Sequence, residues 1–467
     1  MEVESPWLSF RAEGKEIRIG SNVSLPQSAG ASVPESLVTI DEDGVYHVMV
    51  MSLEQRVVID RIKIFQNGLF DLDYPKWIII FAGKKSDMKT IHNPFITRGY
   101  IPDECFCDRV SETQRLAKSL MNGNDVVLFS PRRMGKTGLI THVFEREEIK
   151  RSYYTFFVDI LHTTSLREFT FFLGKEVFRA LQPAGKKVLD KLVSALKSLQ
   201  GKITYDSVTG QPSFGVSLGD IQRPEFTLEE IFNYLDNAGK PCLVAIDEFQ
   251  QINEYEDGNV EALLRGHIQK MKNCHFVFAG SKRSIMSAMF QSPARPFYKS
   301  ADPLELKALD KDIYSDFVGK MFNEYGKRIA KAVVEYVYDL FEGYTYYMQR
   351  VFNEAFASID RGEECSIEVI RMSIDNILLM NEVQFAELMS SLTENQKRVL
   401  SAIANEARVR NVNTSAFINR YQLSTASVVN AAIRKLLKED IITVDLKEYS
   451  IPDKFLWLWV NRQYNNA

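Results

Sequence analysis

The sequence has no uninterrupted run of about 18 apolar residues, the length that a membrane-spanning helix needs, so we expect no membrane partner. Its first residues, 1–5, lack the basic flank and the apolar core of a signal peptide. The five cysteines show no disulfide rhythm, and Cys105 and Cys107 are too close together for an ordinary zinc pair and have no second pair. These absences predict a protein of the reducing cytoplasm.

Several catalytic motifs are also missing. The six histidines include no H-E-x-x-H arrangement, and no G-x-S-x-G nucleophile elbow occurs. Positive charge is not in excess, because 57 Lys and Arg stand against 61 Asp and Glu, with a net charge of −4. A global basic field for nucleic acid is therefore excluded, although a local basic face is not. The length and the 45% apolar content predict a globular chain of roughly two to four domains.

A phosphate-binding pattern is present in the first half of the chain. Apolar residues 126–129 predict a buried strand, residues 130–135 a loop, and Lys136 the start of an apolar-periodic helix. The loop follows the pattern G-x-x-x-x-G-K-[ST], except that Ser130 replaces the first glycine. The residues expected to bind nucleotide phosphates are Ser130, Pro131, Arg132, Arg133, Met134, Gly135, Lys136, Thr137 and Gly138.

Each residue type in this pattern has a physical reason. Gly135 allows the backbone to turn its amides inward, and these amides and the helix N-terminus form an anion site. Lys136 is expected to reach the β and γ phosphates. The hydroxyl of Thr137 is expected to bind Mg²⁺, which prefers oxygen ligands.

Two adjacent carboxylates form the second half of the pattern. Asp247 and Glu248 follow a continuous apolar run, residues 242–246, which predicts a strand buried on both faces. Asp247 is expected to support Mg²⁺, directly or through water, and Glu248 to polarise the attacking water as a general base. Such a pair alone is more often part of a solvated loop. Downstream of a phosphate loop, a nucleotide site is the better interpretation.

Together, residues 130–137 (SPRRMGKT), 245–250 (AIDEFQ) and 278–281 (FAGS) resemble the archaeal-type ATPase family. That family also occurs in bacteria and lies close to the AAA+ and STAND branches of P-loop NTPases. The resemblance covers about residues 92–467. It implies an α/β fold, in which a P-loop NTPase core with a parallel sheet carries a helical lid and a C-terminal winged helix. It also implies ATP and Mg²⁺ as cofactors.

The resemblance suggests roles for several further residues. Ser281 stands where AAA+ relatives carry a polar sensor of the γ-phosphate, and STAND-type relatives place a phosphate-binding basic residue near Arg283. A solvated positive charge is an equally good interpretation of Arg283. Arg295 stands where AAA+ proteins place an arginine finger, which would stabilise the transferred phosphoryl group from a neighbouring subunit or domain, so an oligomer is possible. Residues 95–100, which begin with Phe95, would border the adenine, unless they only pack the leading loop.

Four parts are expected along the chain. Residues 1–87 form a β-rich segment, which is either an accessory domain or an upstream extension. Residues 92–308 form the ATPase core, 309–388 the helical lid and 389–467 the winged helix. Within the core, Thr227 followed by Glu230 predicts a capping box at the start of a helix over 227–237.

The winged helix does not decide whether the partner is DNA or a protein. The outer face of its third helix, residues 425–438, would carry Ser427, Asn430, Arg434, Lys435 and Lys438. A DNA-reading helix usually places its base contacts near its start, whereas these basic residues come late. The favoured function is ATP hydrolysis that drives a conformational switch of lid and winged helix. The alternative is a nucleotide-gated DNA-binding regulator or mobile-element factor with little hydrolysis; the winged helix could also bind a protein partner, and a scaffold with a degenerate pocket is a weaker third reading.

Overall fold

The computed structural model describes residues 92–99, 101–199, 214–445 and 447–465, and elsewhere only the backbone of short strands. The chain forms two units, Met1–His92 and Asn93–Ala467. The first unit contains two three-stranded sheets with the orders β2-β1-β3 and β4-β5-β6. Their strands are β1 (Leu8–Ala12), β2 (Lys15–Ile19), β3 (Ser32–Val33), β4 (Val38–Ile40), β5 (Tyr46–Met51) and β6 (Arg56–Ile62).

The second unit is built on a five-stranded parallel sheet with the order β13-β7-β12-β11-β8. Its strands are β7 (Val126–Phe129), β8 (Tyr154–Asp159), β11 (Cys242–Asp247), β12 (Cys274–Gly280) and β13 (Asp302–Glu305). Every residue of β7 and β11 is buried, as the continuous apolar runs predict for strands that are covered on both faces. The expected α/β core with a parallel sheet is confirmed.

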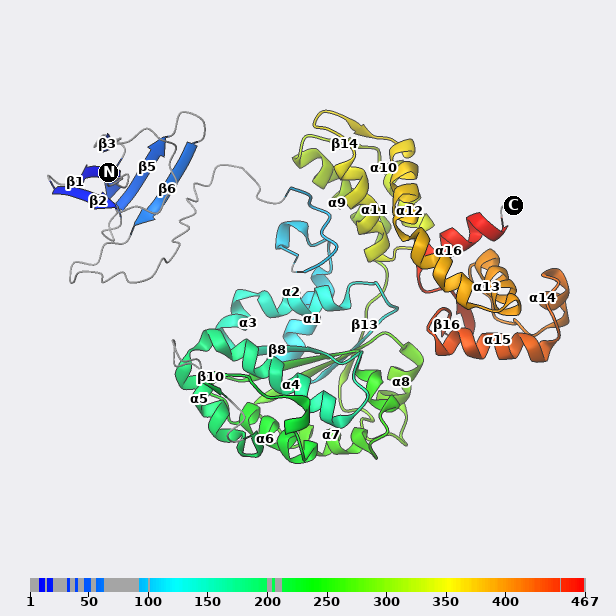
Figure 1. Cartoon of the computed structure of the whole chain (residues 1–467), viewed down its shortest axis with the longest axis horizontal. Helices are drawn as coiled ribbons and strands as arrows, with labels where there is room; N and C mark the ends of the chain where they lie inside the picture. The colour runs from blue at the N-terminus through cyan, green and yellow to red at the C-terminus, as the bar shows by residue number, and fades with distance from the viewer. Residues whose placement is uncertain are drawn as a thin grey trace, which may run out of the picture. The chain divides into compact units, whose positions relative to one another are not determined.

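Helices cover both faces of this sheet (Figure 1). One face packs on α1, α2 and α3 through a cluster that includes Leu116 and Leu139. The other face packs on α4, α6 and α7 through a larger cluster that includes Leu173 and Leu264. The helices are α1 (Val110–Met121), α2 (Lys136–Glu145), α3 (Glu147–Ser152), α4 (Leu166–Leu181), α5 (Lys186–Ala195), α6 (Pro224–Asp236), α7 (Val260–Ile268) and α8 (Arg283–Gln291).

Short elements complete this core. The antiparallel pair β9 (Thr204–Tyr205) and β10 (Pro212–Ser213) forms a small separate sheet. The 3₁₀ helices are η2 (Asp103–Cys105), η3 (Gln182–Ala184), η4 (Lys197–Leu199), η5 (Leu218–Asp220) and η6 (Phe249–Glu254).

The predicted capping box at Thr227 is wrong. Helix α6 begins at Pro224, because proline suits the first turn of a helix, where its missing N–H has no intrahelical partner. Thr227 therefore lies inside the helix, and its hydroxyl donates to the carbonyl oxygen of Arg223 at 3.3 Å. The Glu230 carboxylate instead accepts the backbone N–H of Ser198, at 3.0 Å from Oε2.

Four helices follow the sheet and form the lid. They are α9 (Lys311–Glu324), α10 (Lys331–Leu340), α11 (Thr345–Ala357) and α12 (Ile367–Ser391), with a short parallel pair of β14 (Arg328–Ile329) and β15 (Glu364–Cys365) beside them. Asp310 caps α9, because its carboxylate accepts the backbone N–H groups of Asp312 and Ile313 at 2.9 and 3.1 Å.

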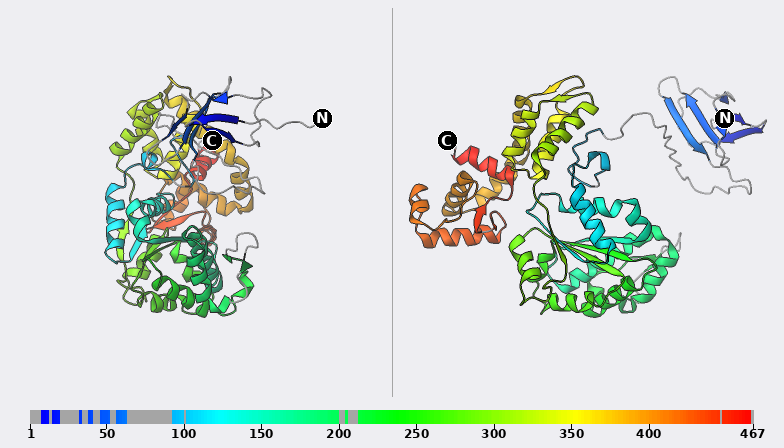
Figure 2. Two further views of the ribbon diagram at one scale, coloured as in Figure 1. Left: turned by 90° about the vertical axis from the view of Figure 1, so that its left-hand side faces the viewer. Right: turned by 180° about the vertical axis from the view of Figure 1, so that it is seen from behind.

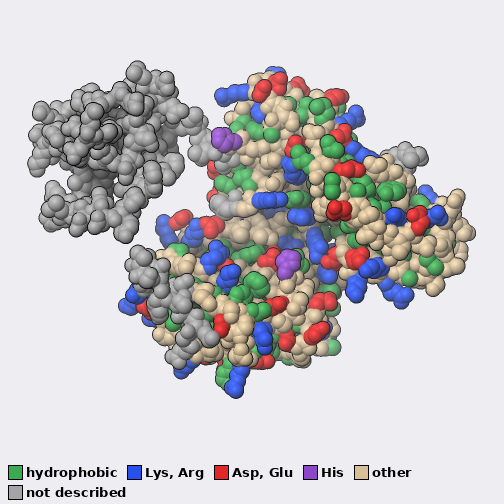
Figure 3. All heavy atoms as spheres, viewed as in Figure 1, with side chains coloured by type: hydrophobic (Ala, Val, Ile, Leu, Met, Phe, Trp, Pro, Cys, Tyr) green, Lys and Arg blue, Asp and Glu red, His purple; other side chains and the backbone are tan. Residues whose placement is uncertain are grey.

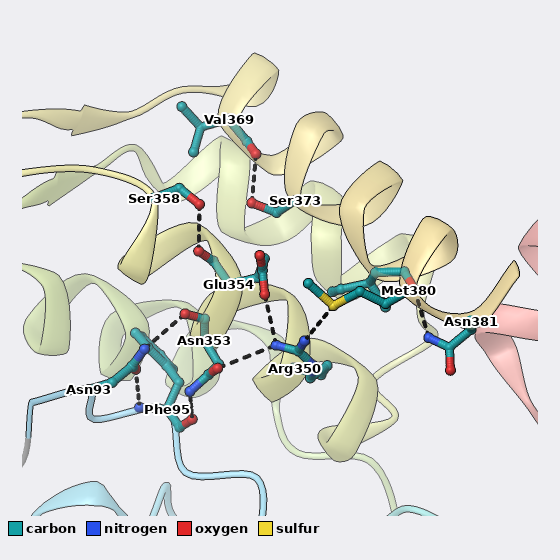
Figure 4. Close-up of polar contacts among 11 residues, drawn as sticks. Asn93, Phe95, Arg350, Asn353, Glu354, Ser358, Val369, Ser373, Met380 and Asn381 are labelled. Carbon is teal, nitrogen blue, oxygen red and sulfur yellow. Dashed lines mark hydrogen bonds and ion pairs between the residues drawn. The ribbon is translucent and has the colours of Figure 1, made fainter.

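The segment that leads into the core is tied to the lid (Figure 4). The side-chain amide of Asn93 donates to the carbonyl oxygen of Asn353 on α11, and that of Asn353 donates to the carbonyl oxygen of Phe95, each at 2.8 Å. The Phe95 ring is fully buried, 5.4 Å from Phe322 and 5.6 Å from Phe352 between ring centroids. Phe95 therefore packs in the core of the lid, so of its two interpretations the structure supports packing and not an adenine contact.

The C-terminal region has the expected winged-helix order, with one helix more. Its elements are α13 (Glu394–Glu406), α14 (Ser415–Arg420), α15 (Ala426–Lys438), β16 (Thr443–Asp445), β17 (Glu448–Ser450), α16 (Lys454–Val460) and the π-helix η7 (Asn461–Asn465). The additional helix α16 packs against both α12 and α13 (Figure 2). Among the described residues, none of the helices combines the length and the apolar character that crossing a membrane requires.

The lid and the winged helix share one apolar core. Phe341 and Tyr347 of the lid lie 5.6 and 5.1 Å from the Phe455 ring of α16, between ring centroids. Glu342 binds the Lys454 ammonium at 2.9 Å and also pairs with Arg408. Lys454 is only 3% exposed, and a buried charge is costly unless it is paired. These contacts join the lid and the winged helix.

Candidate nucleotide site

The residues predicted to bind phosphate form a tight loop between β7 and α2. Gly135 lies directly before the helix with φ of 91°, and Arg133 also has a positive φ, 69°. Glycine suits this left-handed backbone, in which a side chain would be strained. The loop leads into the N-terminus of α2, where unpaired amides and the helix dipole attract anions. The local geometry therefore fits an anion site.

The phosphate-loop region contacts the end of β11, the strand that carries the acidic pair, directly. The Thr137 hydroxyl donates to Asp247 Oδ2 at 2.8 Å, although the two residues are 110 positions apart. Asp247 ends β11, and β12 lies between β11 and β7 in the sheet. Because parallel strands end at the same edge, the sheet brings the two halves of the predicted site together. A hydroxyl and a carboxylate also provide the oxygen ligands that Mg²⁺ prefers, so these two residues fit that ion.

Buried charges surround this contact. Lys136 is 6% exposed and Asp247 is 5% exposed. Burial lowers the pKa of Lys136, while the carboxylates of Glu248 and Asp247 oppose this change. Burial raises the pKa of Asp247, and the Lys136 ammonium opposes that change. The site therefore holds one ammonium and two carboxylates at the edge of the sheet.

Other residues of the loop make structural contacts. Ser130 is buried, and its backbone N–H donates to the Gly280 carbonyl oxygen at 3.4 Å, which ties the loop to β12. The Ser130 hydroxyl donates to the carbonyl oxygen of Pro131 at 3.0 Å. The buried Met134 offers its carbonyl oxygen to the Arg109 guanidinium at 3.4 Å. Gly138 lies in the first turn of α2.

Glu248 has an unusual backbone and two side-chain partners. Its φ of 56° and ψ of 39° lie in the left-handed region, which is sparsely populated for residues other than glycine and recurs at functional sites. The Ser281 hydroxyl donates to Glu248 Oε2 at 2.6 Å. The side-chain amide of Gln250 donates to the same oxygen at 2.5 Å. The structure thus places Ser281 beside the proposed base, as the end of β12 lies next to that of β11.

The lid meets the phosphate loop at the start of α11. The Tyr346 backbone N–H donates to the carbonyl oxygen of Arg133 at 3.1 Å, and the Arg133 guanidinium lies 4.2 Å from the centroid of the Tyr346 ring. The Thr345 hydroxyl donates to the carbonyl oxygen of Met134 at 3.5 Å. Through these contacts the first turn of α11 lies against the phosphate loop.

The winged helix also reaches the loop. Asp440, two residues after the end of α15, pairs with Arg132 at 3.2 Å and with Lys282, which follows β12, at 3.5 Å. Lys and Arg side chains gather along the hollow between the ATPase core and the lid (Figure 3). The carboxylate of Asp440 thus lies on a basic surface beside the phosphate loop.

The two remaining predicted arginines have partners away from the loop. Arg283 pairs with Glu305 at the end of β13 at 2.7 Å. Arg295 pairs with Glu261 of α7, and its guanidinium also donates to the side-chain oxygen of Asn253. Neither contact tests the predicted roles in phosphate binding or as an arginine finger, and both roles stay predictions.

Sequence analysis did not identify two residues that the structure brings to this site. Gln250 belongs to the run AIDEFQ but has no chemical role in the pattern, so only its bond to Glu248 draws attention to it. Asp440 is 308 positions from Arg132, and no local pattern connects the two.

Comparison with known proteins agrees with this geometry. Residues 106–351, more than half of the chain, match the family described as ATPase domains predominantly from Archaea. Residues 383–462 match a family described as a probable winged helix domain. A search of curated proteins finds no match.

Two solved structures illustrate the likeness. A Walker-type ATPase of Pyrococcus abyssi is 19% identical with a TM-score of 0.55, covering 79% of this chain and 99% of that chain. The ORC2 protein of Aeropyrum pernix, in ADPNP and ADP complexes, is 14% identical with a TM-score of 0.48, covering 80% and 98%. At 19% identity, the first likeness concerns the fold. With its phosphate loop, parallel sheet and C-terminal winged helix, the chain belongs to the family of ATPase domains found predominantly in Archaea.

Proposed function

We propose that this chain is an ATP-binding, Mg²⁺-dependent ATPase whose nucleotide state moves the helical lid and the winged helix. The observation that carries the proposal is the bond between Thr137 and Asp247, which joins the phosphate loop to the acidic strand beside the buried Lys136. We further propose the domain limits 92–308, 309–388 and 389–467 for the core, the lid and the winged helix.

Each residue has a specific task in this proposal. The loop amides and Lys136 hold the β and γ phosphates, because an ammonium and inward amides neutralise their charge. Thr137 and Asp247 would hold Mg²⁺ through their side-chain oxygens, and the ion would supply positive charge next to the phosphates. Glu248 takes a proton from the attacking water.

The proposed switch has a physical route through three contacts. The start of α11 touches the phosphate loop through Tyr346 and Thr345. Glu342, which lies just before α11, joins the lid to the winged helix through Lys454. Asp440 of the winged helix pairs with Arg132 and competes there with nucleotide phosphates for the same positive charge. A ligand shifts such an equilibrium only as far as it binds one state better, and these contacts provide the difference.

The first prediction concerns phosphate binding. Replacing Lys136 with alanine should weaken ATP affinity roughly 10- to 100-fold, because charge-assisted contacts to the phosphates are lost. Titration with a fluorescent ATP analogue measures the effect. Lys118→Ala, on the exposed side of α1, is the control and should bind ATP like the wild type. Equal ATP affinity of Lys136→Ala and wild type would mean that the site is misassigned.

The second prediction concerns hydrolysis. Glu248→Gln should lower kcat about 100-fold or more, because the amide cannot accept a proton from water in the transition state. Its ATP affinity should stay close to that of the wild type, since the side chain keeps its size and its bonding oxygen. Phosphate release under saturating ATP and Mg²⁺ provides the measurement. Hydrolysis at the original rate would remove Glu248 from the mechanism.

The third prediction concerns the winged-helix contact. Asp440→Asn should tighten ATP binding about two- to fivefold at low salt, because exposed ion pairs contribute only ~0.2–1 kcal/mol each. The gain should shrink as salt screens the charges. The adjacent acid offers a matched control, since Glu439 pairs with Lys435 of α15 at 2.5 Å and not with the phosphate loop. If Asp440→Asn and Glu439→Gln bind ATP equally, the contact does not compete with nucleotide.

A second function, nucleotide-gated DNA binding, is favoured by the surface of α15. Its outer side carries Arg434, Lys435 and Lys438, all exposed. Asp440, two residues after the end of the helix, pairs with Arg132 of the phosphate loop. Nucleotide that displaces Asp440 from Arg132 would then change how the basic side of α15 is presented to DNA.

A gel-shift titration with random duplex DNA tests this second function. Binding should weaken steeply with salt, with a slope of about −0.9 per phosphate contact. Replacing Arg434 and Lys438 with alanine should reduce both affinity and slope. The absence of a shift at low salt, with and without ATP, would eliminate this function while leaving the ATPase proposal intact.

A further inference from the structure

The carboxylate of Glu248 accepts hydrogen bonds from two donors in different elements, and both donors bind the same oxygen. The Ser281 hydroxyl comes from the end of β12, and the Gln250 amide comes from η6. Their bonds to Oε2, at 2.6 and 2.5 Å, leave Oε1 outside this pair of contacts. The two oxygens of the carboxylate are therefore distinguished, with one anchored and the other available for a different task.

Gln250 is fixed by its surroundings. Its side chain is 3% exposed, in the first turn after β11. On the other side lies Gly280, where an added Cβ would stand 2.5 Å from Gln250 Oε1 and equally close to Met286 Sδ. Since no real Cβ tolerates that distance to both atoms, the absence of a side chain at Gly280 makes room for the amide. The sheet therefore holds the Gln250 amide against Glu248.

The amide is not an efficient way to stabilise the fold. Among the described residues, Gln250 Oε1 is one of the buried side-chain atoms without a hydrogen-bond partner. A buried polar atom that makes no bond costs stability, and an apolar side chain of the same length would avoid this cost. The half of the amide that does form a bond is the half that contacts Glu248. The arrangement is thus better explained by what Gln250 does to that carboxylate.

We propose that Gln250 is a positioning residue for the hydrolytic carboxylate, an inference that rests on the proposed ATPase function. By anchoring Oε2, it fixes the Glu248 rotamer and reserves Oε1 for the proton of the attacking water. In the step that it supports, the water oxygen bonds to the γ phosphorus as the bond from that phosphorus to the β–γ bridging oxygen breaks. ADP leaves with the electron pair, and the water proton goes to Glu248 Oε1. Fixing a base in place before reaction avoids reorganisation during it.

The test is Gln250→Met in the full-length protein, which keeps the length of the side chain and removes the amide. We expect kcat to fall about tenfold, the loss expected from removing one hydrogen bond to a charged group. KM for ATP should be unchanged, because no nucleotide contact is removed. The thermal midpoint should stay the same or rise, because the substitution also removes the unsatisfied Gln250 Oε1. The matched control is Gln251→Met, since the Gln251 amide donates to the Thr163 carbonyl oxygen at 3.1 Å and not to Glu248.

A double variant with Ser281→Ala removes both anchors and should lower kcat further, towards the level of Glu248→Gln. If Gln250→Met turns over ATP at the wild-type rate, the inference is overturned. A change confined to KM, or a lower thermal midpoint with unchanged kcat, also overturns it, since either result indicates a structural role. The failure of the ATPase proposal is distinguishable, because then the wild-type protein itself would release no phosphate from ATP. An inactive Glu248→Gln beside a fully active Gln250→Met refutes only the role of Gln250.

Discussion

The bond between the Thr137 hydroxyl and the Asp247 carboxylate is the contact on which the rest of the site depends. It exists because β7 and β11 run parallel with only β12 between them, so that a phosphate loop and an acidic pair meet at one edge. The attraction of the Glu248 and Asp247 carboxylates opposes the cost of burying the Lys136 ammonium there. Separating the two strand ends would leave these charges without partners.

From this edge, three layers of contact extend outward. The first is the pair Ser281 and Gln250, which holds Glu248. The second is the start of α11, whose backbone bonds to the loop at Arg133. The third is Asp440, an acid of the winged helix on the basic surface of the loop. The outer contacts are exposed ion pairs, which are weak and screened by salt, whereas the inner ones are buried. This gradient suits a rigid chemical centre with a movable periphery.

The elements of the core were largely predictable because their signals are local. The strand over 126–129 appears in the structure with the expected limits, since a continuous apolar run depends only on neighbouring residues. The start of α6 was not predictable in this way. Thr227 and Glu230 have the spacing of a capping box, but Pro224 begins the helix earlier and Glu230 bonds across to Ser198. A tertiary contact overrode a local pattern.

The residue pattern alone was enough to indicate the family, the phosphate loop and the acidic pair, because their chemistry requires particular residue types at short spacing. The fold was needed to reveal Gln250 on Glu248, Phe95 inside the lid and Asp440 on Arg132. Each of these is a pairing of side chains set by strand order, by helix packing or by the docking of a distant domain. Such pairings depend on three-dimensional distance. Local periodicity cannot predict a contact between two residues that are 308 positions apart, as Arg132 and Asp440 are.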